Sequence, residues 1–203
     1  MKKLDFNKPV HGGDVWTAAQ RWGMDLDEIL DFSANINPLG PSPLALEAIV
    51  ANISRLTHYP EPCGDSCKLA LAEHLEVDEA NVVLGNGGSE LIYLLGRMFY
   101  KKRLVLLAPC FSEYGEGLEN PHILRIPLDA SRGFELPWPG IMEALEPGDL
   151  IFICNPNNPT GNLFNPQQLL ELAAYVRDLS GTMVVDEAFL DFAGRKLSLS
   201  QEV

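Results

Sequence analysis

Residues 150–161 read LIFICNPNNPTG, and residues 182–189 read TMVVDEAF. Each segment is an apolar run that ends abruptly in polar residues, which is typical of strands in a parallel sheet that is covered on both faces. Ligands of such sheets bind outside the carboxyl ends of the strands. We therefore expect Asn158 and Asp186 to meet at one crevice, where they offer an amide and a carboxylate to a flat, charged, nitrogen-containing ring.

Strand and helix signals alternate along most of the chain. The short apolar runs that are candidate strands are 82–84, 104–107, 123–126, 150–154 and 182–185. The segments with helix signals are 42–56, which begins Ser-Pro, 89–98, and 166–180, which has Asn165 as a cap and Gly181 just beyond its end. Repeated strand, right-handed crossover and strand units predict an α/β fold with a mainly parallel sheet and helices on both faces.

The domain organisation follows from where this alternation begins. Residues 1–40 form a loop-rich arm with a short helix near 14–22, and residues 41–203 carry the alternating pattern. A chain of 203 residues, 46% hydrophobic and 21% charged, has enough material for one sizeable core. We therefore predict an arm followed by one large domain.

Charge and composition exclude several classes of protein. The net charge is −13, and the 15 lysines and arginines are spread along the chain, which argues against a nucleic-acid surface. The amino terminus carries no apolar signal core, and no run of eighteen apolar residues occurs, so we predict a cytoplasmic protein that does not bind membranes. Cys63 and Cys67 have helical spacing, but no His or Cys pair follows at zinc-like spacing, so we predict no metal.

Residues 85–90, GNGGSE, lie where a predicted strand turns into a helix. The amide groups and the positive end of such a helix can hold a phosphate dianion, to which Ser89 adds a hydroxyl. Two alternatives are a tight turn without a ligand and a dinucleotide site. The dinucleotide fingerprint fits poorly, because Glu90 replaces its third glycine and no acidic residue follows about twenty positions later.

Asp186 follows four apolar residues, and a carboxylate at that depth is costly unless a cation or a hydrogen-bond donor lies beside it. A protonated ring nitrogen is such a partner, and this pairing turns pyridoxal phosphate into an electron sink. The alternative is that Asp186 or Glu187 only caps or pairs locally. Asn158 lies in a rigid turn that can aim its amide at a ring oxygen, or serve the turn alone. Phe111 or Tyr114 could stack on the ring, or belong to the core.

These residues resemble the fold type I, pyridoxal-phosphate-dependent class I/II aminotransferase superfamily over essentially the whole chain. The resemblance implies roles in cofactor binding for a phosphate loop, a stacking aromatic residue, an amide on the phenolic oxygen and a partner of the ring nitrogen: Gly87, Gly88 and Ser89, then Phe111, Asn158 and Asp186. It also implies that Tyr59 reaches the cofactor phosphate of a neighbouring subunit, and therefore a homodimer.

The arm distinguishes two branches of that superfamily. Residues 11–13 (HGG) and 31–40 (DFSANINPLG) resemble the branch that decarboxylates L-threonine O-3-phosphate to (R)-1-aminopropan-2-yl phosphate in cobalamin biosynthesis. In that branch the resemblance implies substrate contacts from His11, the Gly12 backbone and Asn35, a chemically reasonable seat for a phosphate or carboxylate. Phe189 supports this branch, because the histidinol-phosphate aminotransferase branch usually carries a tyrosine there. That transaminase branch is the alternative.

The chain lacks features that the superfamily carries. The lysine that holds the cofactor covalently, in a Ser-x-x-Lys-like motif, does not appear before Val203, and Lys196 lies too close to Asp186 and in a surface-like turn. We therefore expect an amino-terminal fragment of a longer enzyme, without the carboxy-terminal small domain and inactive alone. A non-catalytic remnant that binds the cofactor or a partner is the other hypothesis.

Overall fold

The computed structural model describes residues 12–116 and 122–202. The chain divides into two compact units, Met1–Pro60 and Glu61–Val203, which are considered separately below. The predicted boundary between an arm and a large domain, at residue 40, stays a prediction.

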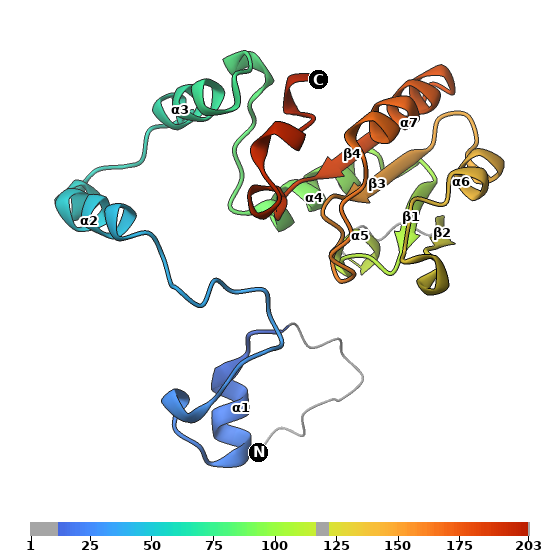
Figure 1. The fold of residues 1–203 in the computed structure, drawn as a ribbon. Coiled ribbons are helices and arrows are strands. Elements are labelled where there is room, and N and C mark those ends of the chain that lie inside the picture. Colours follow the sequence, from blue (N-terminus) through green and yellow to red (C-terminus); the bar gives the residue numbers. More distant parts are fainter. Residues whose placement is uncertain (1–11, 117–121, 203) are drawn as a thin grey trace. The chain divides into compact units, whose positions relative to one another are not determined.

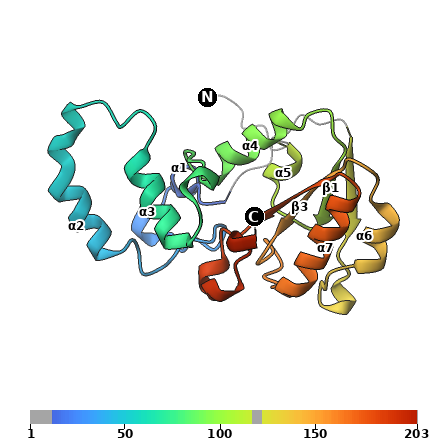
Figure 2. The same cartoon turned by 90° about the horizontal axis from the view of Figure 1, so that it is seen from above.

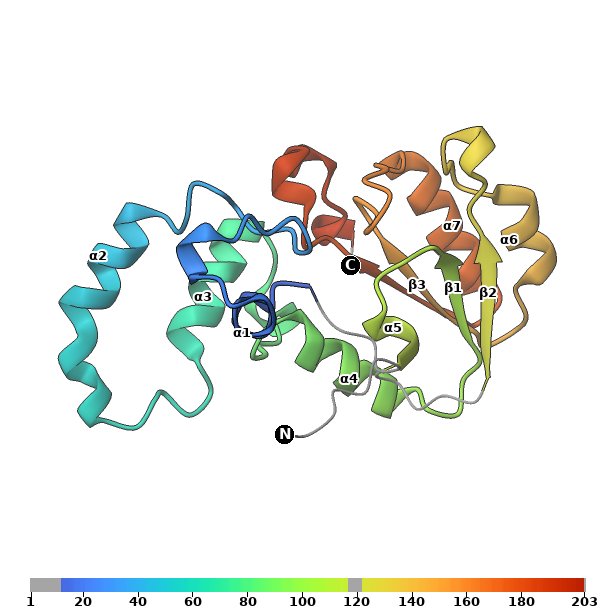
Figure 3. The ribbon, with the colours of Figure 1, turned by 90° about the horizontal axis from the view of Figure 1, so that it is seen from below.

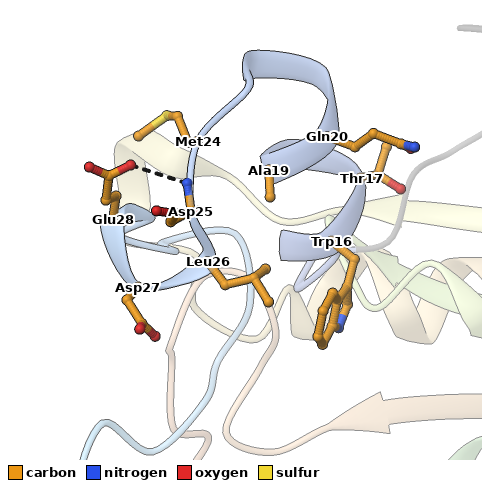
Figure 4. Close-up of a pocket in the computed structure, with 9 residues that line it drawn as sticks. All are labelled: Trp16, Thr17, Ala19, Gln20, Met24, Asp25, Leu26, Asp27 and Glu28. Atoms are coloured by element: carbon orange, nitrogen blue, oxygen red, sulfur yellow. Dashed lines mark hydrogen bonds between the residues drawn. The ribbon is translucent and has the colours of Figure 1, made fainter.

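The amino-terminal unit contains the helices α1 (Val15–Trp22) and α2 (Pro43–Asn52), and α2 continues into a 3-10 turn at Ile53–Thr57. Both helices confirm the sequence predictions. Asp14 caps α1 because its side chain accepts a hydrogen bond of 3.0 Å from the Thr17 N–H. A hollow lies between α1 and the turn that follows it, and Figure 4 shows Trp16, Met24 and Glu28 among its lining residues.

The carboxy-terminal unit holds the sheet. Its helices are α3 (Asp65–Leu75), α4 (Gly88–Met98), α5 (Glu113–Glu116), α6 (Trp138–Ala144) and α7 (Pro166–Asp178). Its strands are β1 (Leu104–Ala108), β2 (Ile123–Pro127), β3 (Leu150–Cys154) and β4 (Thr182–Asp186). The strands pair in the order β2-β1-β3-β4, and every pair is parallel (Figure 1). The predicted parallel α/β architecture is confirmed.

Four of the five predicted strands are present, and the prediction of a strand at residues 82–84 is wrong. Residues 82–84 are an extended segment that pairs with no strand in the described ranges. The side chain of Val83 is 72% exposed. A strand exists only where a neighbour satisfies its backbone groups, so a short apolar run is not sufficient to form one.

The sheet lies between two layers of helices because side chains alternate along each strand. Val105, Leu107, Ile151 and Ile153 pack on one face with residues of α6 and α7. Leu104, Leu106, Leu150 and Phe152 pack on the other face with Ile92 of α4 and Tyr114 of α5. Figures 2 and 3 show α6 and α7 on one side of the strands and α4 and α5 on the other. The predicted cover on both faces is therefore confirmed.

Asn165 and Arg103 fix two ends of this arrangement. The Asn165 side chain accepts a hydrogen bond of 2.8 Å from the Gln167 N–H and caps α7, as predicted. Arg103 precedes β1 and binds the carboxylate of Asp149, which precedes β3, through Nε at 3.0 Å and Nη2 at 2.7 Å. The pair therefore ties together the amino ends of two adjacent strands.

No helix in the described part of the chain is both long enough and apolar enough to cross a lipid bilayer.

Candidate active site

A cavity of about 440 Å³ lies where the carboxyl ends of β3 and β4 meet α4 and the loop after β1. The predicted site residues that line it are Gly88, Ser89, Phe111, Asn158 and Asp186. Its apolar walls include Leu91, Ile92, Phe152, Val184 and Phe189. The structure thus brings five side chains or backbone segments that were predicted separately to one place.

The position of this cavity follows from the strand order. After β1 the chain moves to β2 on one side, whereas β3 lies on the other side of β1. Loops that leave neighbouring strands in opposite directions open a crevice at their carboxyl ends. Phe111 comes from the loop after β1 and Asn158 from the turn after β3, so both face this crevice.

The amino end of α4 forms one end of the cavity. Gly87 is the residue before the helix, with φ of 83°, a conformation that favours glycine. Within the described ranges, no side chain caps this helix end. A methyl group added at Gly88 would meet no atom within 4 Å, so the space beside the first turn is open. The first amides of α4 therefore have no side-chain partner from residues 12–116 and 122–202 and can bind an anion.

Glu90 stabilises the turn that precedes those amides. Its carboxylate accepts hydrogen bonds from the Asn86 backbone N–H at 2.5 Å and from the Asn86 side chain at 3.2 Å. Glu90, which replaces the third glycine of the dinucleotide fingerprint, thus holds the turn from the first turn of α4.

Asp186 lies in the cavity wall with both carboxylate oxygens hydrogen-bonded. Oδ2 accepts the Tyr114 hydroxyl at 2.6 Å, and Oδ1 accepts the Ala188 N–H at 2.9 Å. Its neighbour Glu187 instead accepts the Ser198 hydroxyl at 2.6 Å and the Leu199 N–H at 2.8 Å. The local-pairing alternative therefore describes Glu187 well, although Glu187 also borders the cavity, and Asp186 differs from it in accepting the buried Tyr114 hydroxyl.

Tyr114 is buried behind Asp186 and is not among the residues that line the cavity. Of the two stacking candidates, the structure therefore leaves Phe111. Burial raises the pKa of the Tyr114 hydroxyl far above its usual range, and its neighbours Cys154 and Asp186 raise it further. The phenol is consequently neutral and acts as a hydrogen-bond donor to Asp186.

The three asparagines of the turn after β3 make different contacts. The side chain of Asn157, 3% exposed, donates to the Pro109 carbonyl at 3.1 Å and to the Thr160 hydroxyl at 2.8 Å. The side chain of Asn155 accepts the Phe164 N–H at 2.8 Å. These bonds fix the turn, and Asn158 lines the cavity.

Cys154 is a cavity residue that sequence reasoning did not single out. It is the last residue of β3, and burial raises the pKa of its thiol. The sequence signal that could have found Cys154 is its place at the end of the apolar run 150–154. The structure pairs it with Asp186, at the end of β4.

The remaining predicted residues lie in the amino-terminal unit or outside the described residues. His11 is in the second group. Gly12 is packed so tightly that an added Cβ would lie 1.7 Å from the Ser33 carbonyl oxygen, and the Gly13 N–H donates to the Ser33 hydroxyl at 2.8 Å. Gly12 and Gly13 are thus held against Ser33, which belongs to the second arm segment with the family resemblance. Asn35 lies two residues after Ser33 in the same segment. Tyr59 is fully exposed.

The cavity residues fit pyridoxal phosphate. A volume of about 440 Å³ suits a small cofactor. The open helix end suits a phosphate, the Asp186 carboxylate suits a protonated ring nitrogen, and the apolar walls suit a flat ring. Among the residues that the structure describes, no lysine lines the cavity.

The profile of the family "Aminotransferase class I and II" matches residues 27–202. The chain belongs to this family. Enzymes of the family depend on pyridoxal phosphate.

Three relatives illustrate the similarity. The chain is 37% identical to the threonine-phosphate decarboxylase of Salmonella typhimurium over 186 residues, which are 90% of this chain and 51% of that protein. It is 31% identical to the histidinol-phosphate aminotransferase of Methanopyrus kandleri, over 94% of this chain and 52% of that protein. The crystal structure of the histidinol-phosphate aminotransferase from Clostridium acetobutylicum has a TM-score of 0.76 at 29% identity, over 86% of this chain and 52% of that one. The chain therefore spans about half the length of the relatives it matches.

Proposed function

We propose that the complete protein decarboxylates L-threonine O-3-phosphate to (R)-1-aminopropan-2-yl phosphate, with pyridoxal phosphate as its cofactor, as a step of cobalamin biosynthesis. The observation that carries the proposal is the cavity that joins Asp186, Asn158 and Phe111 to the open end of α4. Two features support decarboxylation in particular. They are the similarity to a threonine-phosphate decarboxylase and the presence of Phe189, which has no hydroxyl, in the cavity wall.

Each cavity residue has a distinct role in this proposal. The bound cofactor supplies an electron-withdrawing ring that accepts the electron pair left on the substrate α-carbon when carbon dioxide departs. Asp186 holds the proton on the ring nitrogen and so maintains the positive charge of the ring. The amides of Gly88 and Ser89 bind the phosphate, and the Ser89 hydroxyl adds a donor. Asn158 donates to the ring oxygen, and Phe111 lies against the ring face.

The apolar walls have a separate task. Phe152, Val184 and Phe189 place hydrocarbon around the ring and exclude water. Exclusion of water strengthens the interaction of Asp186 with a cationic partner, because the local dielectric constant falls.

The arm supplies the proposed substrate contacts. His11, the Gly12 backbone and Asn35 offer an imidazole, an amide and a carboxamide, which suit a phosphate or a carboxylate. The contact of Gly12 with Ser33 supports a shared role, because it joins the segment that carries His11 to the segment that carries Asn35.

Transamination is the second candidate function. The similarity to histidinol-phosphate aminotransferases, at 31% identity over 94% of the chain, favours it almost as strongly. Bond choice at the α-carbon depends on how the substrate is oriented, so the two reactions can share the same cofactor residues.

Product analysis of the complete protein tests the proposal. The protein is incubated with pyridoxal phosphate and L-threonine O-3-phosphate, and separately with pyridoxal phosphate, histidinol phosphate and 2-oxoglutarate. We expect carbon dioxide and aminopropanol phosphate from the first mixture, with no keto acid, and no product from the second. Glutamate formation in the second mixture without carbon dioxide in the first would establish the transaminase. Absence of both reactions, with cofactor bound, would favour a non-catalytic binding protein. Asp186→Asn serves as the inactive control.

We also propose a homodimer in which Tyr59 contacts the cofactor phosphate of the second subunit. Support comes from the full exposure of Tyr59 and from α2, which has no buried residue and exposes Leu44, Ile49 and Val50. Sedimentation velocity tests the assembly. Tyr59→Phe should weaken cofactor binding several-fold without dissociating the dimer.

A further inference from the structure

Tyr114 contacts two of the groups that are proposed to hold the cofactor ring. Its hydroxyl donates to Asp186 Oδ2 at 2.6 Å. Its ring meets the ring of Phe111 edge to face, with centroids 5.6 Å apart and planes at 83°. One side chain thus supports both the proposed partner of the ring nitrogen and the proposed stacking residue.

The surroundings of Tyr114 hold it in one position. It lies in α5, and its ring also packs on Phe152 of β3 with centroids 5.2 Å apart. The side chain is 0% exposed, so water does not compete for its hydroxyl. A donor that is fixed by the core fixes its acceptor, because a buried hydrogen bond between a phenol and a carboxylate is costly to break.

The two hydrogen bonds to Asp186 come from different directions in the chain. Tyr114 approaches Oδ2 from α5, and the Ala188 N–H approaches Oδ1 from the residues that follow β4. Together they prevent rotation of the carboxylate. Because burial keeps the phenol protonated, Tyr114 can only donate to Asp186 and cannot compete with it as a base.

We infer that Tyr114 is a positioning residue that aims the Asp186 carboxylate at the ring nitrogen of the cofactor and supports Phe111 against the ring face. This inference rests on the proposed cofactor site. Tyr114 itself does not line the cavity, so it acts through Asp186 and Phe111.

The test compares two ligands that differ only at the ring nitrogen. Pyridoxamine phosphate and its analogue with carbon in place of that nitrogen are titrated into the wild-type protein and into Tyr114→Phe, Asp186→Asn and the double variant. The amine form of the cofactor avoids any covalent attachment to a lysine. The matched control is Tyr93→Phe, which also loses a phenol that donates to a carboxylate, that of Glu113 at 2.8 Å, and not to that of Asp186.

We expect the wild-type protein to bind the nitrogen ring at least roughly tenfold more tightly than the carbon ring, because a charge-assisted hydrogen bond distinguishes them. Asp186→Asn should remove this preference. Tyr114→Phe should reduce the preference by roughly three- to tenfold in the wild-type background and have no effect on it in the Asp186→Asn background. Tyr93→Phe should leave it unchanged.

The outcomes separate the inference from the proposed cofactor site. If Asp186→Asn retains the preference for nitrogen, the proposed site is wrong. If Asp186→Asn removes the preference while Tyr114→Phe keeps it, or if Tyr114→Phe weakens both ligands equally, the site stands and the positioning role is wrong. A crystal structure of the wild-type protein with pyridoxamine phosphate gives a check that needs no variant. Asp186 must then contact Tyr114 and the ring nitrogen at the same time.

Discussion

The ion pair between Arg103 and Asp149 joins the amino ends of β1 and β3, and its loss should destabilise the sheet that carries the cavity. Asp149 is 4% exposed and accepts two hydrogen bonds from Arg103. In Arg103→Met the buried carboxylate keeps the Glu146 N–H, at 2.8 Å, as its remaining partner among the described residues. Breaking a fully buried pair costs about 3–5 kcal/mol. Because the Arg103 side chain is 27% exposed, water replaces part of the interaction, and we expect about 2–4 kcal/mol.

Urea unfolding followed by tryptophan fluorescence measures this loss. The chain has three tryptophans, of which Trp16 and Trp22 lie in the amino-terminal unit, so both are replaced by phenylalanine and Trp138 reports on the carboxy-terminal unit. With a urea dependence of roughly 2 kcal/mol per molar, the midpoint should fall by about 1–2 M. The matched control is Arg132→Met, because Arg132 pairs with Glu135 on the surface at 3.2 Å. That variant should change stability by less than about 0.5 kcal/mol.

A double variant shows whether the uncompensated charge causes the loss. Arg103→Met with Asp149→Leu leaves no buried carboxylate, so it should be more stable than Arg103→Met alone. The reasoning is refuted if Arg103→Met costs no more than Arg132→Met, or if the double variant is the least stable of the set.

The remaining predictions concern three single residues. Gly88→Ala should fold as well as the wild-type protein, because its Cβ meets no atom within 4 Å, yet bind inorganic phosphate and the cofactor at least severalfold more weakly in equilibrium titrations, because the methyl group enters the cavity. Gly12→Ala should disrupt the contact with Ser33, since the new Cβ would lie 1.7 Å from a carbonyl oxygen, and faster proteolysis of the arm by a low concentration of trypsin would reveal it. Burial raises the pKa of the Cys110 thiol to about 11, so Cys110 should react slowly with iodoacetamide at pH 8 while the exposed Cys63 reacts readily. The folded state holds that proton to about pH 11 whereas the free thiol loses it near pH 9, so stability should fall as the pH rises between these values, and a Cys110→Ala variant should lose that part of the fall in thermal unfolding.

The sheet was predictable where local signals and long-range pairing agree. The runs that form β3 and β4 are apolar over their whole length, and the cap at Asn165 and the glycine at Gly181 mark the helix between them. The run at 82–84 has the same local appearance but no partner strand in the described ranges. Strand pairing depends on segments that are distant in sequence, so an apolar run alone does not determine it.

The site was predictable in its chemistry and less so in its geometry. Phe111 and Tyr114 are three residues apart in the segment after β1, and the sequence offers both as stacking residues. The difference between them arises because Tyr114 packs on Phe152, which belongs to a strand that begins far along the chain. The hydrogen bond from Tyr114 to Asp186 joins residues 72 positions apart, and no local pattern indicates it.

The orientation of the Asp186 side chain follows from strand geometry. Cys154 pairs with Asp186 in the β3–β4 register, and Val184 packs with Cys154 on the face that α4 and α5 cover. Because side chains alternate along a strand, Asp186 points to the same face as Val184, which is the face of the cavity and of Tyr114. Glu187 follows the strand, also borders the cavity, and binds the chain at Ser198 and Leu199. A shift of one residue in this register would turn Asp186 to the other face of the sheet, so the parallel pairing of β3 and β4 is what places its carboxylate beside Tyr114 and against the proposed cofactor ring.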